Sequence, residues 1–332
     1  MGHGAGMSLQ EPNTKTRKKR SRWGRVGKVA ERWHGCLHVD AGVRAGISRA
    51  ALYRQVPDRG WDKPYPRVFV LPGAPDTEAR RIAAAMLAVG GADPKVWADR
   101  WTALWLHGLL RNPPTTIHLA VPDGQSYPTL KRVKVRRSST LVDEHTTEVL
   151  RLPTLNPARA LVDMGAVAAK AYLRGLIIDA RQRGLASLAQ LDEVLEGLPN
   201  VRGRKLLAQL VWELDEERCD SVLEALVREV LRAAGVAAPH PEPYRIETPH
   251  RTLELDIAWP ALRCGIEVDG MGFHSARDHL DTDQRRHNAL VLAGWRVLRV
   301  GWYRVEDPKE REGFLREVGE LLAGARGRGP RA

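Results

Sequence analysis

Two short stretches near the C-terminal end combine strand-like alternation with acidic side chains. They span residues 253–259 and 265–270, and the segment between them is short enough to turn the chain back as a hairpin. Because successive side chains of a strand alternate sides, the acids share one face of each strand: Glu254 and Asp256 on the first, Glu267 and Asp269 on the second. Crowded carboxylates raise one another's pKa unless a cation intervenes, so this pattern predicts a divalent metal bound by oxygen ligands.

Length and composition indicate a globular chain of more than one domain. Its 332 residues are 43% hydrophobic, which is enough for sizeable cores. No apolar run approaches the ~20 residues that cross a bilayer, and no apolar stretch follows the N-terminal charges, so we expect a cytoplasmic protein without a membrane helix. Cys36, Cys219 and Cys264 are widely spaced, which argues against a disulfide framework and a structural zinc site.

The net charge of +12 is concentrated at the N-terminus, where residues 11–32 hold nine Lys or Arg against two acids. Lys and Arg gain affinity for nucleic acids by displacing counterions from phosphates, so DNA is the expected partner. Residues 1–30 are expected to be a disordered basic tail. Its densest part, residues 15–22, is either a solubilising tail or an arm that follows phosphates.

The next segment, residues 31–75, has the pattern of a winged helix-turn-helix. Two short helices are expected on either side of Gly46, with Ser48 as the N-cap of the second, and residues 61–71 suit a wing hairpin. In such a unit the second helix enters the major groove, where it would offer DNA three side chains: Arg49, Tyr53 and Arg54. The alternative is a helical pair with a purely structural role.

Residues 76–215 are expected to form a middle region, with strands first and helices after. Trp97, Trp101 and Trp105 recur at helical spacing and are expected to pack in the core from one helix face. A basic strand at 133–137 offers a second candidate phosphate surface, although charge on a solvated edge strand explains it nearly as well.

From residue 216 to 325 the expected order is helix, strand, strand, helix, strand, helix, followed by a tail at 326–332. This order resembles the PD-(D/E)XK nuclease superfamily, and more narrowly the very-short-patch-repair-like endonuclease domains of bacterial proteins. The matching stretches are 255–260, 266–274, 283–288 and 293–299. The region before it resembles the winged-helix region of abortive-infection type IV antitoxins, best at 46–52 and 156–163.

These resemblances imply a mixed α/β (α+β) chain: an N-terminal winged helix-turn-helix, a helical middle region and a C-terminal restriction-endonuclease-like αββαβα domain. They also imply that Asp256 and Glu267 ligate Mg²⁺, with Mn²⁺ as a substitute, and that Val268 adds its backbone carbonyl. Glu224 occupies a helix position that often supplies a further carboxylate. An ion pair with Arg228 four residues on is the alternative role for Glu224.

The chain departs from the superfamily at Asp269, which stands where a lysine is frequent. A lysine would stabilise developing negative charge, whereas an aspartate can only bind metal or accept a proton. His274 is a candidate general acid or base and Arg286 a candidate phosphate ligand. Their alternatives are a hydrogen-bonded surface histidine and an arginine paired with nearby acids such as Asp283.

Two functions follow from these patterns. The first is a metal-dependent DNA endonuclease that hydrolyses phosphodiester bonds and is guided to DNA by the winged helix. The alternative is a DNA-binding, antitoxin-like transcriptional regulator whose nuclease fold is catalytically weak or inactive. The sequence identifies no protein partner.

Overall fold

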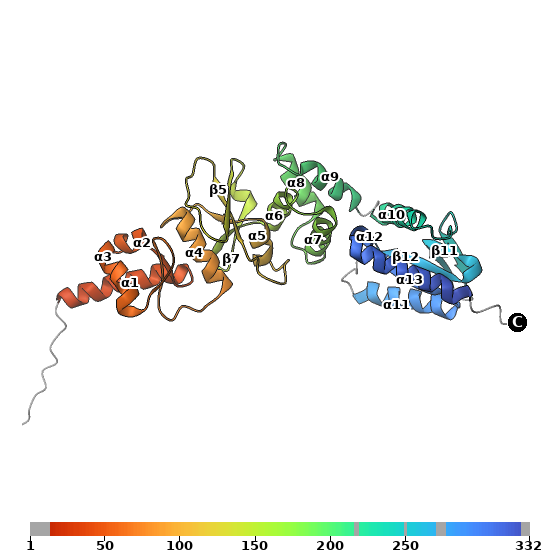
Figure 1. Ribbon diagram of the computed structural model, residues 1–332, viewed down its shortest axis with the longest axis horizontal. Coiled ribbons are helices and arrows are strands. Elements are labelled where there is room, and N and C mark those ends of the chain that lie inside the picture. The colour runs from red at the N-terminus through yellow and green to blue at the C-terminus, as the bar shows by residue number, and fades with distance from the viewer. Residues whose placement is uncertain (1–13, 216–218, 249–250, 270–276, 327–332) are drawn as a thin grey trace, which may run out of the picture. The chain divides into compact units, whose positions relative to one another are not determined.

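The computed structural model describes residues 14–215, 219–248, 251–269 and 277–326 (Figure 1). It is a mixed α/β structure with several small sheets, as the sequence predicts at this level. The chain divides into two compact units, Met1–Asn156 and Pro157–Ala332. This division falls inside the expected middle region 76–215, after its strands and before its helices.

The first unit begins with helices around a small sheet. Its elements are α1 (Thr14–Arg32), β1 (Cys36–His38), α2 (Val39–Arg44), α3 (Arg49–Arg59), β2 (Asp62–Tyr65) and β3 (Val68–Val70). The strands pair in the order β1-β3-β2. The Ser48 side chain accepts a hydrogen bond from the Ala51 N–H at 3.3 Å, which confirms it as the N-cap of α3. The two expected short helices and the hairpin after them are therefore present.

Helix α1 corrects the expectation of a disordered segment at 1–30, from Thr14 onward. Val26 and Ala30 are buried in a core cluster that also contains Leu52. Trp23 packs edge-on against Trp61, with ring centroids 5.9 Å apart. These apolar positions fall on one side of a basic helix, so the density of charge in the sequence hid an amphipathic element.

The rest of the first unit is built on a five-stranded sheet of order β6-β5-β4-β8-β7. Its elements are α4 (Glu78–Gly90), β4 (Trp97–Ala98), α5 (Arg100–Leu106), β5 (Ile117–Pro122), β6 (Val133–Ser138), η1 (Asp143–His145), β7 (Thr146–Val149) and β8 (Leu152–Leu155). Trp97 lies in β4, whereas Trp101 and Trp105 lie on α5. The prediction that all three tryptophans share one helix face is therefore wrong for Trp97.

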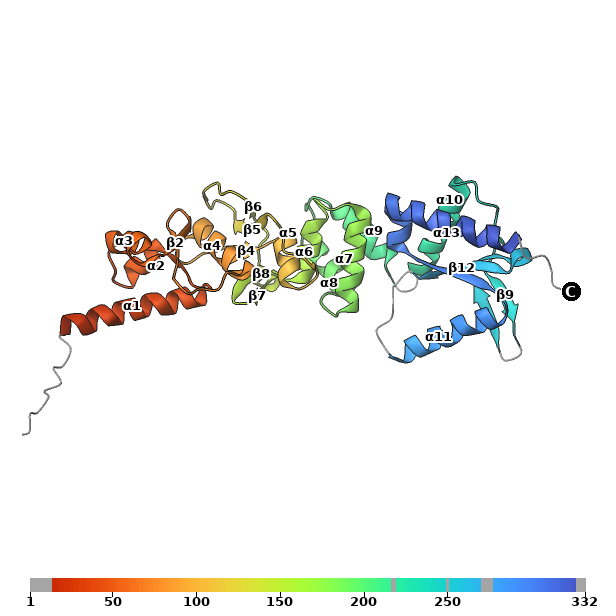
Figure 2. The same cartoon turned by 60° about the horizontal axis from the view of Figure 1, so that its bottom comes forward.

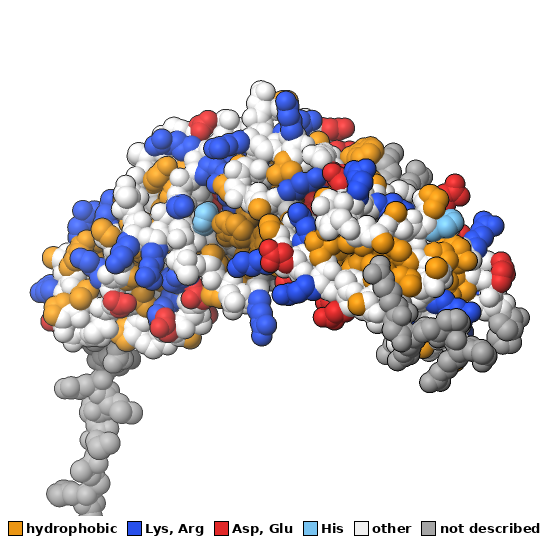
Figure 3. Space-filling view, turned by 45° about the vertical axis from the view of Figure 1, so that its right-hand side comes forward, with side chains coloured by type: hydrophobic (Ala, Val, Ile, Leu, Met, Phe, Trp, Pro, Cys, Tyr) orange, Lys and Arg blue, Asp and Glu red, His pale blue; other side chains and the backbone are white. Residues whose placement is uncertain are grey.

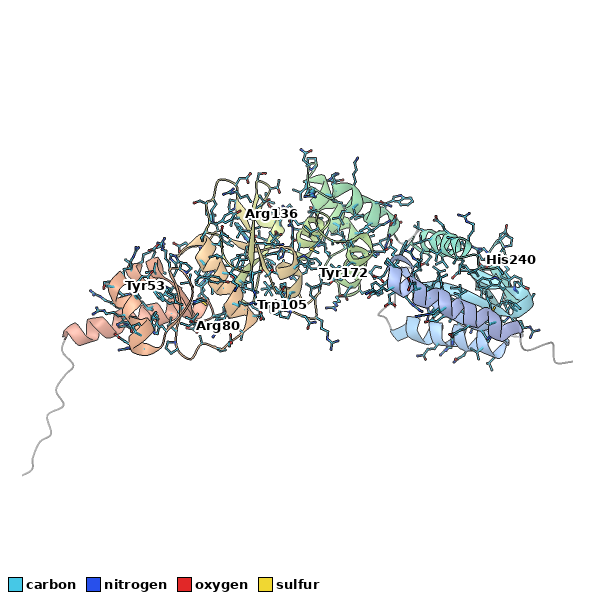
Figure 4. All side chains as sticks on the ribbon, viewed as in Figure 1. Tyr53, Arg80, Trp105, Arg136, Tyr172 and His240 are labelled. Carbon is cyan, nitrogen blue, oxygen red and sulfur yellow. The ribbon has the colours of Figure 1, made fainter. Side chains whose placement is uncertain are left out.

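Arg136 on the basic strand β6 has a structural partner (Figure 4). Its guanidinium donates two hydrogen bonds to the buried carboxylate of Asp99, at 2.9 and 3.1 Å. The positive charge of Arg136 is therefore offset by Asp99, which leaves one charge fewer on the expected phosphate-binding surface of this strand.

The second unit starts with four helices: α6 (Pro157–Met164), α7 (Lys170–Gln182), α8 (Leu188–Glu196) and α9 (Arg204–Glu213). Then follow α10 (Cys219–Ala233), β9 (Tyr244–Glu247), β10 (Thr252–Leu255), β11 (Ile257–Trp259), η2 (Pro260–Leu262), β12 (Cys264–Asp269), α11 (Arg277–Leu292), β13 (Arg296–Gly301), α12 (Trp302–Glu306) and α13 (Pro308–Arg326). The expected order of helices and strands is present, with β9 and α12 as additions.

A three-stranded sheet of order β11-β12-β13 forms the centre of this C-terminal part. The predicted hairpin is confirmed for β11 and β12, which pair antiparallel, whereas β12 and β13 pair parallel. The first acidic stretch is not one strand: it breaks at Asp256, and β10 pairs with β9 instead. Helices α10 and α13 lie on one side of the sheet and α11 on the other (Figure 2).

A buried arginine ties the four helices to this part. Arg174 on α7 pairs with Glu213 on α9 at 2.5 Å and with Glu306 on α12 at 2.7 Å. Its guanidinium carbon lies 3.6 Å from the ring centroid of Trp302. The expected boundary at 215 therefore separates segments that share a buried ionic network.

Two expectations about the chain's chemistry can be compared with the structure. The three cysteines are free and buried, as the absence of a disulfide pattern predicts. Of the helices in the described part of the chain, none is both long and apolar enough to cross a membrane.

We expect Arg174→Gln to destabilise the second unit strongly, because it leaves Glu213 and Glu306 buried without their main cation. Removing one partner of a buried pair costs about 3–5 kcal/mol. The matched control is Arg183→Gln, which breaks the solvent-accessible pair with Asp179 on α7 and should cost less than about 1 kcal/mol. Urea unfolding measures both, and equal effects of the two substitutions would contradict the role of Arg174.

Candidate functional site

Asp256 lies at the break between β10 and β11, where the chain passes from one sheet to the other. Its Oδ2 accepts a hydrogen bond from the Val268 N–H at 2.8 Å. Its backbone carbonyl accepts one from Nη2 of Arg228 at 2.7 Å. Because the strand breaks here, the Asp256 carboxylate bonds to the backbone of the neighbouring strand β12. In a continuous β-strand, two backbone groups would pair at this position. Asp256 and Val268 are brought together as the hairpin predicts.

The environment of Asp256 opposes its ionisation. Burial raises the pKa of this carboxyl above its usual value, and the nearby charges of Glu224 and Glu267 raise it further. The hydrogen bond from Val268 and the charge of Arg286 act in the opposite direction but do not cancel the rise. Negative charge at Asp256 is therefore undercompensated, which a cation would relieve.

Glu267 is the most enclosed acid of the site, with 8% of its side chain exposed. Its Oε1 accepts a hydrogen bond from Nε of Arg286 at 2.7 Å, and its Oε2 lies 3.9 Å from Nε of Arg299. Arg286 also donates to the carbonyl of Glu254 at 2.5 Å. Arg286, the expected phosphate ligand, thus lies against the expected metal ligand Glu267.

Asp269 lies on the same strand, with about a quarter of its side chain exposed. Its Oδ2 is 3.6 Å from Nη2 of Arg299. The parallel register sets Glu267 directly opposite Arg299, so this arginine faces both acids. Sequence reasoning left Arg299 without a role, because neither the register nor the direction of β13 can be read from the strand alone.

Glu224 and Glu254 lie at the margins of the site. Glu224 pairs with Arg228 at 2.8 Å, which is the ion-pair role left open by the sequence, yet its charge still reaches Asp256. Arg228 also donates to the carbonyl of His240, at 2.9 Å. Glu254 has half of its side chain exposed and lies 3.6 Å from Arg245, so it does not join the other acids.

His274 lies outside the described residues, and the side chain of Asp283 is not described either. Across residues 14–215, 219–248, 251–269 and 277–326, no group of three or more His, Cys, Asp and Glu side chains is arranged to hold a metal ion. The cluster of three or four acids expected on one metal is therefore not formed there.

A smaller donor set remains, made of the carboxylates of Asp256 and Glu267 and the carbonyl of Val268. Carboxylate and carbonyl oxygens are the hard ligands that Mg²⁺ takes in proteins. The raised pKa of Asp256 adds an electrostatic reason for a cation at this place. These oxygen ligands are of the chemical type that binds a divalent metal. Arg286 already pairs with Glu267, so a metal would compete with Arg286 for this carboxylate.

The expected DNA-contacting residues lie on α3 in the first unit. Arg49 pairs with Asp40 at 3.0 Å, and Arg67 pairs with the same carboxylate at 2.5 Å. Desolvation raises the pKa of Asp40, but the hydrogen bond from Arg67 and the charges of the arginines bring it below its usual value. Asp40 therefore stays ionised and offsets part of the positive charge at the start of α3.

Tyr53 and Arg54 lie further along α3. Tyr53 has 37% of its surface exposed and packs edge-on against Phe69 at 5.1 Å (Figure 4). Arg54 is exposed and makes no ion pair with any residue of the described chain. Of the three residues expected to contact DNA, Arg54 thus has the most accessible charge. Tyr53 is partly buried by its packing against Phe69.

No protein-family model matches the chain, and no curated protein matches it. Among solved structures, the crystal structure of the RV2827C protein from Mycobacterium tuberculosis is similar, with a TM-score of 0.38 and 16% sequence identity. The alignment covers 68% of this chain and 90% of that chain. A likeness of this size carries no argument about fold or function.

We expect Arg286→Gln to raise the affinity of the site for Mg²⁺ or Mn²⁺, because it removes the cation that pairs with Glu267. A unit charge about 5 Å away at a partly exposed site is worth roughly 1–3 kcal/mol, or about 5- to 150-fold in affinity. Isothermal titration calorimetry of the protein with each metal measures the change.

The neighbouring Arg285→Gln is the matched control, since it removes the same charge from the same helix at an exposed position. It should leave metal affinity nearly unchanged. Weaker metal binding in Arg286→Gln, or an equal gain in both variants, would show that Arg286 and the metal do not compete for Glu267.

Proposed function

We propose that this chain is a metal-dependent DNA endonuclease, with a restriction-endonuclease-like C-terminal domain of the PD-(D/E)XK type and a winged helix that delivers it to DNA. The observation that carries the proposal is the junction of Asp256 with β12: a carboxylate of raised pKa bonded to the Val268 N–H, one residue from the buried Glu267. Phosphodiester hydrolysis needs charge compensation and an activated water, and this junction has oxygen donors suited to both tasks.

Each residue of the junction has a distinct part in this proposal. Asp256 and Glu267 would hold a divalent cation, with Mn²⁺ able to replace Mg²⁺, and Val268 would add its carbonyl oxygen. When bound, that cation would lower the pKa of water and offset charge on the phosphate. The Val268 N–H fixes one oxygen of Asp256, so the carboxylate is held in orientation before any ligand arrives.

The first unit supports DNA as the substrate. Lys and Arg side chains are spread over it among fewer acidic ones on the face seen in Figure 3. The pair α2 and α3 with the hairpin β2–β3 has the element order of a winged helix-turn-helix, in which the second helix enters the major groove. We place the protein in the cytoplasm, where its three free thiols would stay reduced.

The proposal is tested by incubating the full chain with supercoiled and linear DNA in Mg²⁺ or Mn²⁺. We expect cleavage by wild type and a loss of at least 100-fold in Asp256→Ala and Glu267→Gln, because each removes a ligand of the cation. The glutamine keeps an acceptor for Arg286, which limits damage to the fold.

Glu254→Ala is the matched control for this assay. It removes an acid two residues before Asp256 whose side chain is half exposed and lies beside Arg245. Its cleavage rate should stay within twofold of wild type. Equal cleavage by wild type, Asp256→Ala and Glu267→Gln would point to a contaminating nuclease and sink the proposal.

A second candidate is the antitoxin-like DNA-binding regulator, in which the nuclease fold is an inactive platform. Three observations favour it: Glu267 is paired with arginine, Asp269 stands in place of lysine, and the described residues hold no group of three metal-ligating side chains. In this reading the chain binds the promoter of its own gene and does not cut it.

Fluorescence anisotropy with promoter DNA tests the role of α3 in either candidate. We expect Arg54→Ala to weaken binding by about 1–3 kcal/mol if it reads a base, and Asp40→Asn to strengthen binding because it removes a negative charge beside Arg49. For the regulator, Asp256→Ala should bind as wild type does. Unchanged affinity in both Arg54→Ala and Asp40→Asn would exclude α3 from the DNA interface.

A further inference from the structure

One arginine faces both acids of β12 from the neighbouring strand. In the parallel pairing of β12 with β13, Arg299 stands opposite Glu267, and paired residues of neighbouring strands point to the same face of a sheet. Its Nε lies 3.9 Å from Oε2 of Glu267 and its Nη2 lies 3.6 Å from Oδ2 of Asp269. The guanidinium therefore lies against both Glu267, the expected metal ligand, and Asp269, which stands where a lysine is frequent.

Position 269 holds an acid where a nuclease of this type often has a cation. Negative charge grows on the phosphate oxygens in the transition state, and a fixed cation beside them lowers the barrier. Asp269 cannot supply that charge. Arg299 brings it to the same place from β13, because its guanidinium lies within 3.6 Å of the Asp269 carboxylate.

The chemistry and exposure of Arg299 suit contact with a phosphate. Its guanidinium is charged at all accessible pH values and can bind two phosphate oxygens at once. Its side chain is 37% exposed, whereas that of Glu267 beneath it is 8% exposed. Arg299 can thus meet a ligand from solvent while the carboxylates orient it from below.

Arg286 is less suited to this task. It is bound on two sides, by Nε to Oε1 of Glu267 at 2.7 Å and by Nη2 to the carbonyl of Glu254 at 2.5 Å. One bond ties α11 to β12 and the other ties α11 to β10.

We propose that Arg299 is a catalytic residue that contacts the scissile phosphate and supplies, from β13, the positive charge that a lysine at position 269 would provide. Asp269 is then a positioning residue that holds the guanidinium beside Glu267. The catalytic part of this inference rests on the proposed nuclease activity, whereas the phosphate contact can be measured without it.

The test compares full-length wild type with Arg299→Ala, Arg299→Lys and the double variant Asp269→Lys/Arg299→Ala. Single-turnover cleavage in Mn²⁺ should fall about 10²–10³-fold in Arg299→Ala, as for loss of one transition-state donor. Arg299→Lys should retain at least a tenth of the wild-type rate. The double variant should regain at least tenfold over Arg299→Ala, because it restores a cation at the same place from β12.

The second readout is DNA affinity in EDTA as a function of salt. Loss of one phosphate contact should reduce the slope of log K against log salt by about 0.9 in Arg299→Ala. Arg232→Ala is the matched control, because Arg232 is exposed on α10 and makes no ion pair with a described residue. It should change neither the cleavage rate nor the slope.

The outcomes separate this inference from the proposed function. Wild type that binds DNA without cutting it overturns the nuclease activity, and an unchanged slope in Arg299→Ala then overturns the phosphate contact as well. Wild type that cuts, with Arg299→Ala cutting within twofold of it, overturns the inference alone. Equal loss of rate and of thermal stability in Arg299→Ala and Arg299→Lys also overturns it, because that pattern marks a structural residue.

Discussion

The C-terminal part of the second unit depends on how one buried carboxylate, that of Glu267, is paired. Glu267 lies inside the sheet β11-β12-β13, and an unpaired charge there would be expensive. Arg286 reaches it from α11 and Arg299 from β13, so a single acid links three elements that follow one another in the chain. The same pairing affects metal binding, because a cation at Glu267 would compete with Arg286 for the carboxylate.

Part of the site could be predicted from the sequence because its geometry is local. A hairpin with acids at period two brings Asp256 against Val268, and this contact is present at 2.8 Å. The expected grouping of four acids fails for a different reason: Glu254 turns to Arg245 once the strand breaks at Asp256, and Glu224 is paired with Arg228. Alternation alone cannot reveal which acids find arginines from distant segments.

The fold, like the site, could be predicted where it depends on local sequence patterns. Caps, turns and apolar periods predict the short helices around Gly46 and the order of elements after residue 219. They do not reveal that Arg174 joins Glu306 across 132 residues, so the expected boundary at 215 misses the tie between helices and sheet. Helix α1 was missed because its apolar positions are outnumbered by Lys and Arg, although Val26 and Ala30 are buried.

In the proposed function, Asp256 and Glu267 together hold a divalent cation. Anomalous diffraction from crystals of the full chain soaked in Mn²⁺ can locate that cation. We expect a peak about 2.1 Å from a carboxylate oxygen of each residue, near the Val268 carbonyl, with Arg286 moved away from Oε1 of Glu267. Absence of a peak at these carboxylates, with Arg286 still bonded to Glu267 at high Mn²⁺, would contradict it.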